Sequence, residues 1–149
     1  MHSDLRHRKR VRTKLMVQTE ALRLFAAQGY HETSVEQIAS AAAISPRTFY
    51  RYFPSKESVV LWDEYDDLPA EQLWEAHAGS DPYALLIRRL RELIGELYLN
   101  DRHRLLARTR LSFRVPEIRA RFVDEQMATI GARFAYLGTI TGASRDDLA

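Results

Sequence analysis

The chain has 149 residues, a formal net charge of +2 and no cysteine. This length suits one domain, or a small domain joined to a second one, and the lack of cysteine excludes disulfides and thiolate metal sites. No segment approaches the ~20 apolar residues that cross a bilayer, and no secretion signal is visible, so we expect a cytoplasmic protein without a membrane partner.

The positive charge is concentrated at one end of the chain. Residues 1–60 contain 10 Lys or Arg and 5 Asp or Glu, whereas residues 61–149 contain 12 and 15. A basic end joined to a mildly acidic body is typical of a protein that meets a polyanion at its basic end. Nucleic acid and an anionic membrane both fit, but no basic helix with a wide apolar face supports the membrane.

The first expected elements are a charged arm and a helix. Residues 1–12 hold five closely spaced Arg and Lys side chains without an apolar period, which predicts a flexible basic arm. Such an arm either contacts DNA or stays a solvated tail. From Thr13, a candidate N-cap, apolar side chains recur at helical spacing up to Gly29, which suits the left-handed position after a helix.

Two short helices are expected next. Thr33 and Glu36 have the spacing of a capping box and open a helix of about two turns. Ser45 is the expected N-cap of the following helix, whose first residue is Pro46 and whose Phe49 and Phe53 point inward. Two short helices joined by a short turn form a helix-turn-helix, which sets its second helix into the major groove of DNA.

The remaining positions of this second helix are suited to DNA contact. None is acidic, whereas an ordinary solvated helix face mixes both signs. Their side chains can donate to phosphates, reach base edges or stack. These positions are Arg47, Thr48, Tyr50, Arg51 and Tyr52.

The rest of the chain predicts a helical body. Ser55 is the expected cap of a fourth helix, followed by an acidic run at Asp63–Asp67 that we expect to be solvated. Further helices are predicted over 83–99, 101–113 and 116–137, and no segment alternates as a strand does, so the predicted fold class is all-α. Aromatic and Met side chains of the body are candidates for an effector pocket or for plain core; they are Trp74, Tyr98, Phe113, Phe122 and Met127.

Catalytic and metal sites are not indicated. The five His residues show no metal-ligand spacing, and no nucleophile motif accompanies the Ser, His and Asp residues. We therefore expect neither an enzyme nor a metal or other cofactor.

The run from Val17 to Lys56 resembles the DNA-binding domain of the TetR family of bacterial transcriptional regulators. The matching positions are Val17, Ala21, Leu24, Phe25, Gly29, Tyr30, Thr33, Ser34, Val35, Ile38, Ala39, Ala42, Ile44, Ser45, Thr48, Phe49, Tyr50, Tyr52, Phe53, Ser55 and Lys56. The resemblance implies a helix-turn-helix domain over 13–56 and a ligand-binding and dimerisation body over 57–149. Around Arg114–Ala120 the body resembles a subgroup that includes mycofactocin-system regulators.

The resemblance also implies roles for individual residues. The amides and hydroxyls at Thr33 and Ser34 meet phosphate, Arg47, Thr48 and Arg51 read bases or phosphates, Tyr50 and Tyr52 grip the backbone, and Lys56 anchors a phosphate. The predicted DNA-binding set is Thr33, Ser34, Ser45, Pro46, Arg47, Thr48, Tyr50, Arg51, Tyr52 and Lys56.

Two departures from the family pattern stand out. Ala43 occupies a turn position where the family usually has glycine, and a positive φ there costs alanine about 1 kcal/mol. Family members also continue through two more helices that pair in a dimer, so we expect the body to be incomplete where the sequence ends at Ser144–Ala149.

The function expected from these observations is a ligand-responsive repressor. Its partners are a palindromic DNA operator, a small-molecule effector and a second copy of the chain, with the homodimer in question because of the short body. The alternative is a shortened interaction protein that pairs with a full-length relative and blocks its DNA binding.

Overall fold

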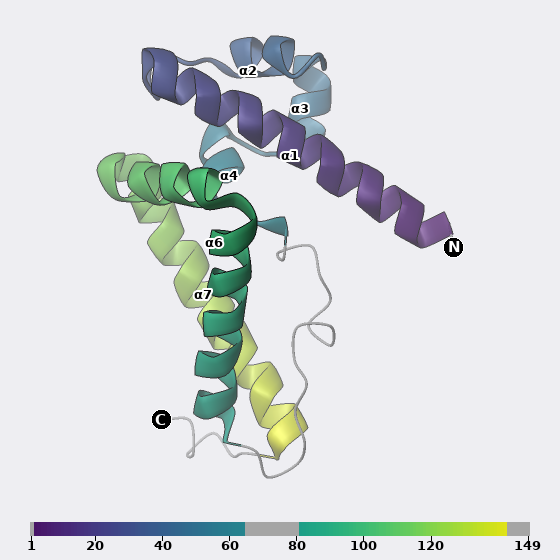
Figure 1. The fold of residues 1–149 in the computed structure, drawn as a ribbon, viewed down its shortest axis with the longest axis vertical. Coiled ribbons are helices and arrows are strands. Elements are labelled where there is room, and N and C mark those ends of the chain that lie inside the picture. Colours follow the sequence, from purple (N-terminus) through teal and green to yellow (C-terminus); the bar gives the residue numbers. More distant parts are fainter. Residues whose placement is uncertain (1, 65–80, 143–149) are drawn as a thin grey trace.

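The computed structural model describes residues 2–64 and 81–142, and the regular elements in these ranges are all α-helices (Figure 1). The predicted all-α class is confirmed. The helices are α1 (His2–Gln28), α2 (Val35–Ala41), α3 (Pro46–Tyr52), α4 (Lys56–Leu61), α6 (Pro82–Arg114) and α7 (Pro116–Thr141). No helix among the described residues combines the length and apolarity needed to cross a membrane.

Helix α1 is longer than the sequence pattern predicts. It begins at His2, so the segment predicted to be a disordered arm is helical, and Thr13 lies inside the helix with its hydroxyl donating to the Lys9 carbonyl at 3.0 Å. Arg and Lys are good helix formers, which allows the helix to extend through the charged turns. The predicted end is confirmed, because Gly29 follows the helix at a φ of 95°.

The first four helices share one core. Val17 and Phe25 of α1, Ile38 of α2 and Phe49 of α3 are all buried in it. Between α2 and α3 the chain turns at Ala43, whose φ is 52°, and the Ile44 amide donates to the Ala39 carbonyl at 2.9 Å. The positive φ considered for Ala43 is therefore present, and alanine occupies a conformation that favours glycine.

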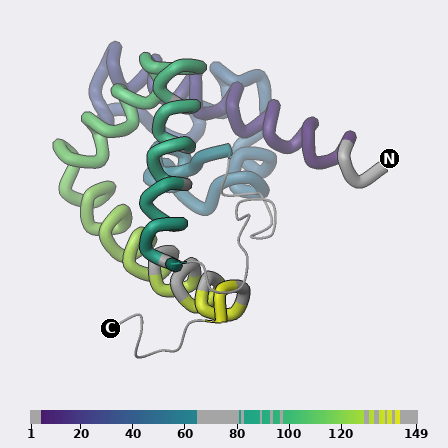
Figure 2. The backbone as a smooth tube through the Cα atoms, turned by 60° about the horizontal axis from the view of Figure 1, so that its bottom comes forward, coloured from purple at the N-terminus to yellow at the C-terminus, as the bar shows by residue number. Residues whose placement is uncertain are grey.

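Helices α6 and α7 form the described part of the body and pack along each other (Figures 1 and 2). The predicted break between two body helices is a kink in α6 at Asp101, whose carboxylate accepts from the Arg104 amide at 3.1 Å. Val115 and Ile118, where α6 gives way to α7, are buried in the same core as α1–α4. The body is thus packed directly onto the N-terminal domain, against α1 and α4.

Candidate nucleic-acid interface

The start of α3 is fixed by a cap. Ser45 is its N-cap, as predicted: its Oγ accepts from the Thr48 amide at 3.1 Å and donates to the Thr48 hydroxyl at 2.9 Å. Pro46 occupies the first turn, where its missing N–H costs nothing. These contacts hold the hydroxyls of Ser45 and Thr48 together at the N-terminus of α3.

The two faces of α3 differ as the sequence predicts. Phe49 and Phe53 are buried, with ring centroids 5.9 Å apart. Arg47, Tyr50 and Arg51 are exposed, and Tyr50 exposes 54% of its surface.

Tyr52 is intermediate between these faces. It is half-buried and packs on the core, while the Arg51 guanidinium lies 5.2 Å from its ring centroid. The exposed side of α3 therefore presents two guanidinium groups and a phenol, with no acidic side chain in the helix.

The cap of α2 differs from the prediction by one residue. Ser34, not Thr33, is the N-cap: its Oγ accepts from the Gln37 amide at 3.1 Å, and its own amide donates to Gln37 Oε1 at 2.8 Å. Gln37 serves as the third residue of the box, so Glu36 is not needed there. Ser34 is exposed at the start of α2, where backbone amides favour phosphate.

Thr33 has an internal role instead. It exposes only 1% of its surface, and its hydroxyl donates to the Gly29 carbonyl at 2.7 Å and accepts from Gln28 Nε2 at 3.2 Å. The Gln28 amide also donates to Gln37 Oε1 at 2.9 Å. The Thr33 hydroxyl is therefore engaged inside the domain, and a phosphate contact at Thr33 stays a prediction.

Lys56 is engaged with the turn between α1 and α2. Its Nζ donates to the carbonyls of Tyr30 at 2.8 Å and Thr33 at 3.1 Å, and it lies 4.2 Å from the Tyr30 ring centroid. These contacts tie the start of α4 to the loop that leads into α2. A phosphate contact by Lys56 stays a prediction.

Tyr30 and Glu57 form a second link between the same segments. The Tyr30 hydroxyl donates to the Glu57 carboxylate. Burial, together with the hydrogen bond and the charge of Glu57, raises the pKa of Tyr30. Burial opposes ionisation of Glu57, but hydrogen bonds from Ser55, Tyr30 and the Glu57 amide, together with the charge of Lys56, outweigh it and lower the pKa of this carboxyl. The pair therefore favours a neutral phenol and an ionised carboxylate.

Arg108 of α6 binds the end of α4. Arg108 donates to the carbonyls of Val60 at 2.8 Å and Leu61 at 2.9 Å, and its guanidinium pairs with Asp63 at 2.7 Å. The last carbonyls of a helix have no partner inside the helix, and here the body supplies one. Sequence reasoning missed Arg108, since its partners lie more than 40 positions away.

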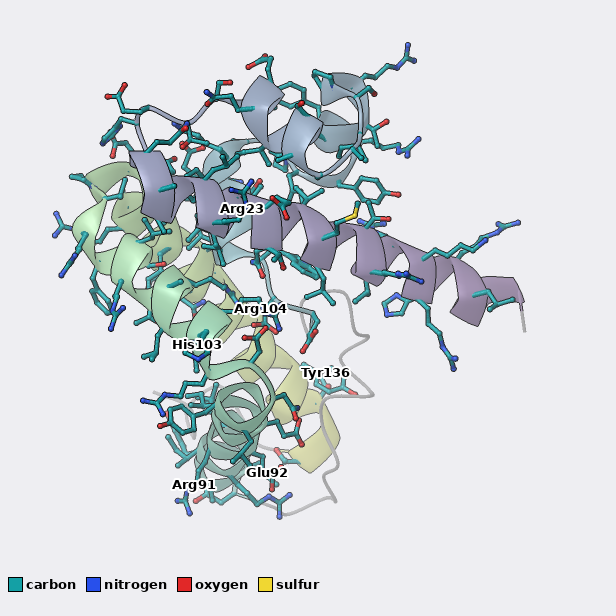
Figure 3. The ribbon with its side chains drawn as sticks, turned by 45° about the horizontal axis from the view of Figure 1, so that its top comes forward. Arg23, Arg91, Glu92, His103, Arg104 and Tyr136 are labelled. Carbon is teal, nitrogen blue, oxygen red and sulfur yellow. The ribbon has the colours of Figure 1, made fainter. Side chains whose placement is uncertain are left out.

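Arg104, one turn before Arg108 on α6, contacts α1 and the residue Glu64 that follows α4 (Figure 3). Its guanidinium donates to Gln18 Oε1 at 3.1 Å and lies 3.6 Å from a Glu64 carboxylate oxygen. The prediction that the acidic run is merely solvated is thus wrong for Asp63 and Glu64, which pair with arginines only 12% and 10% exposed. Asp66 and Asp67 lie outside the described residues.

The predicted effector-pocket residues do not come together. Tyr98, Phe113 and Met127 expose 47%, 65% and 66% of their surfaces, and Phe122 is half-buried. Trp74 lies outside the described residues. Three of the four predicted pocket residues that the structure describes face solvent, and a ligand pocket at this set stays a prediction.

Comparison with known proteins identifies the domain. Residues 19–61, from the middle of α1 to the end of α4, match the model of the tetR family of bacterial regulatory proteins. TcmR of Streptomyces glaucescens, an HTH-type transcriptional regulator, is 35% identical over 150 residues, which cover 96% of this chain and 66% of TcmR. The chain belongs to the TetR family of bacterial transcriptional regulators.

Other relatives match mainly over shorter segments. EthR of Mycolicibacterium smegmatis, an HTH-type transcriptional regulator, is 51% identical over 41 residues, or 28% of this chain and 19% of EthR. MftR of Mycobacterium tuberculosis is 39% identical over 62 residues, or 42% of this chain and 31% of MftR. The names of these relatives describe transcriptional regulators. This agrees with the prediction that the chain is a DNA-binding TetR protein rather than an enzyme. Membership of the mycofactocin subgroup stays a prediction.

Proposed function

We propose that this TetR protein is a ligand-responsive repressor that binds a palindromic operator as a homodimer, with α3 in the major groove. The observation that carries the proposal is the exposed side of α3, which presents Arg47, Tyr50 and Arg51 and no carboxylate. Bidentate guanidinium groups suit guanine edges and phosphates alike. Occupation of a promoter by the dimer then excludes the transcription machinery.

The surrounding residues take supporting roles. The exposed amide end of α2 at Ser34 binds a backbone phosphate, and the Ser45–Thr48 pair holds the N-terminus of α3 close to the duplex. Thr33 and Lys56 act indirectly, because their contacts fix the angle at which α2 enters the domain.

Self-association is supported by the exposed side chains of the body. Ile87, Ile94 and Tyr98 share one face of α6 and expose 57%, 57% and 47% of their surfaces. On α7, Val123 and Met127 are one turn apart and exposed by 52% and 66%. Large apolar side chains that gather in this way favour contact with another protein surface.

Ligand response follows from the link between body and domain. Arg104 connects α6 to α1, and Arg108 connects α6 to α4, through partly buried, charge-assisted hydrogen bonds. An effector that displaces α6 therefore displaces α4 and, through the shared core, α3. Recognition helices must match successive major grooves about 34 to 36 Å apart, so a small rotation of each subunit weakens operator binding.

The test is selection of duplexes from a random 30-base-pair library. We expect enrichment of an inverted repeat whose half-sites lie about one helical turn apart. The double variant Arg47→Ala/Arg51→Ala should enrich nothing, whereas Arg23→Ala, which removes an exposed arginine of α1 outside α3, should enrich the same repeat. Failure of the native chain to enrich any sequence, or enrichment of a single asymmetric site, would contradict the proposal.

A further inference from the structure

The N-terminal turns of α1 extend beyond the other helices, as both ribbon and tube views show (Figures 1 and 2). Within the domain, α1 buries the face that carries Lys14, Val17 and Ala21. Counting back along that face in steps of three or four residues leads to Arg10 and Arg6, with Lys9 beside them. The side of α1 that packs on the helix-turn-helix thus continues as a row of cations.

These cations border a cleft shared with α3. A cavity of about 290 Å³ is lined by Arg6, Lys9, Arg10, Arg51 and Tyr52. Four of the five lining side chains are cationic and none is acidic. The volume equals that of roughly ten water molecules in the liquid, which leaves room for a hydrated phosphodiester group.

The charge of this cleft calls for an anionic occupant. The cationic side chains that line the cleft give it a positive potential, which attracts an anion. Arg51 already lies against the Tyr52 ring, 5.2 Å from its centroid, which restricts its guanidinium to the neighbourhood of the cleft. Arginine and lysine together provide both bidentate and point-charge contacts to phosphate.

The position of the cleft favours DNA over a membrane as the source of phosphate. Two of its lining residues belong to α3, so a duplex that receives α3 in its major groove passes the cleft. Residues 2–12 contain only Leu5 and Val11 as apolar side chains, which do not make the wide apolar face of a membrane-binding helix.

We propose that the cleft between α1 and α3 binds a phosphate of the DNA backbone, so that the basic turns of α1 form a second grip on the duplex. The inference rests on the proposed function and deepens it. Arg6, Lys9 and Arg10 carry no sequence information in this role and add affinity that depends strongly on salt.

The test compares two double variants by salt titration on the selected duplex. Arg6→Ala/Lys9→Ala removes two cations from the cleft, and Arg8→Ala/Arg12→Ala removes two from the same turns outside it. Alanine keeps the helix in both, which circular dichroism checks. Loss of one phosphate contact in each subunit, two in the dimer, should reduce the slope of log K against log salt by about 1.8 and weaken binding about sixtyfold at 0.1 M salt. The control should lose less than about threefold, since long-range attraction is screened at that salt.

The outcomes separate the inference from the proposed function. Equal losses in both double variants would mean diffuse charge and would overturn the inference alone. A native chain that binds no duplex specifically would overturn the proposed function and the inference with it. Binding to phosphatidylglycerol vesicles tests the membrane as the other source of phosphate. If the protein binds these vesicles in competition with DNA, and only the cleft variant loses this binding, the cleft binds a membrane and the DNA contact is overturned.

Discussion

The guanidinium of Arg104 on α6 donates a 3.1 Å hydrogen bond to the side-chain oxygen of Gln18 on α1. The amide of the same Gln18, which is fully buried, donates to the carbonyls of Val59 at 2.7 Å and Trp62 at 2.9 Å. One side chain therefore connects the DNA-binding domain, the end of α4 and the body.

Replacing Gln18 by leucine tests this connection. Leucine fills most of the volume but removes the Gln18 hydrogen bonds to the Val59 and Trp62 carbonyls and one of the acceptors of Arg104, so the free energy of unfolding should fall by about 2 to 4 kcal/mol. Urea denaturation measures the change. Gln126→Leu, at an exposed position of α7, is the matched control and should change the free energy of unfolding by less than about 0.5 kcal/mol. A Gln18→Leu protein as stable as the native chain would contradict the assigned role.

Ala43→Gly should stabilise the domain. Glycine adopts a positive φ without the clash that alanine suffers at 52°, and this gain exceeds the added flexibility of the unfolded chain, for a net of about 0.5 to 1 kcal/mol. Thermal unfolding is the measurement. Ala41→Gly, at the last residue of α2, should have the opposite sign and cost about 0.5 kcal/mol. Destabilisation by both glycines would show that Ala43 is not strained.

Lys56→Met separates the positioning role of Lys56 from a phosphate contact. Methionine loses both carbonyl contacts, and we expect a loss of about 1 to 2 kcal/mol in the free energy of unfolding with an unchanged salt slope of DNA binding. Denaturation and salt titration are performed on the same protein. A stable variant whose slope falls by about 1.8, or 0.9 for each subunit of the dimer, would instead show that Lys56 anchors a phosphate.

The Tyr30–Glu57 pair predicts a pH range of greatest stability. Glu57 has a lowered pKa, so its contribution is present above its ordinary value of 4.5 and is lost as the pH falls below it. Tyr30 has a raised pKa, so its contribution is present below its ordinary value of 10.0 and is lost as the pH rises above it. Denaturation of native and Tyr30→Phe proteins across this range should show the largest difference near neutrality. A difference that does not vary with pH would contradict the coupling.

Local patterns in the sequence were sufficient for most helix boundaries. Ser45 and Pro46 mark the start of α3, and Gly29 marks the end of α1, because caps and left-handed positions depend on one or two residues. The cap of α2 was misplaced because Thr33 and Ser34 both suit the position. The choice depends on whether Glu36 or Gln37 returns the hydrogen bond.

Long-range contacts account for what sequence reasoning missed. The buried pairing of Asp63 with Arg108 joins α4 to α6, and no local pattern distinguishes it from a solvated acidic run. For residues 2–12 the reason is local: their charge density predicts a flexible arm, whereas the helix propensity of Arg and Lys prevails in the structure. On α3, by contrast, the burial of Phe49 and the exposure of Arg47 follow from helical spacing alone.

The central claim is that α3 reads DNA sequence, and fluorescence anisotropy with the selected duplex and a scrambled duplex tests it most directly. Arg47→Lys keeps the charge but loses the bidentate geometry, so its preference for the selected duplex should fall by about 1 to 3 kcal/mol for each half-site, or roughly fivefold to 150-fold, with little change on scrambled DNA. Arg23→Lys is the control. Equal affinity of the native chain for both duplexes, or equal losses on both in Arg47→Lys, would contradict sequence reading by α3.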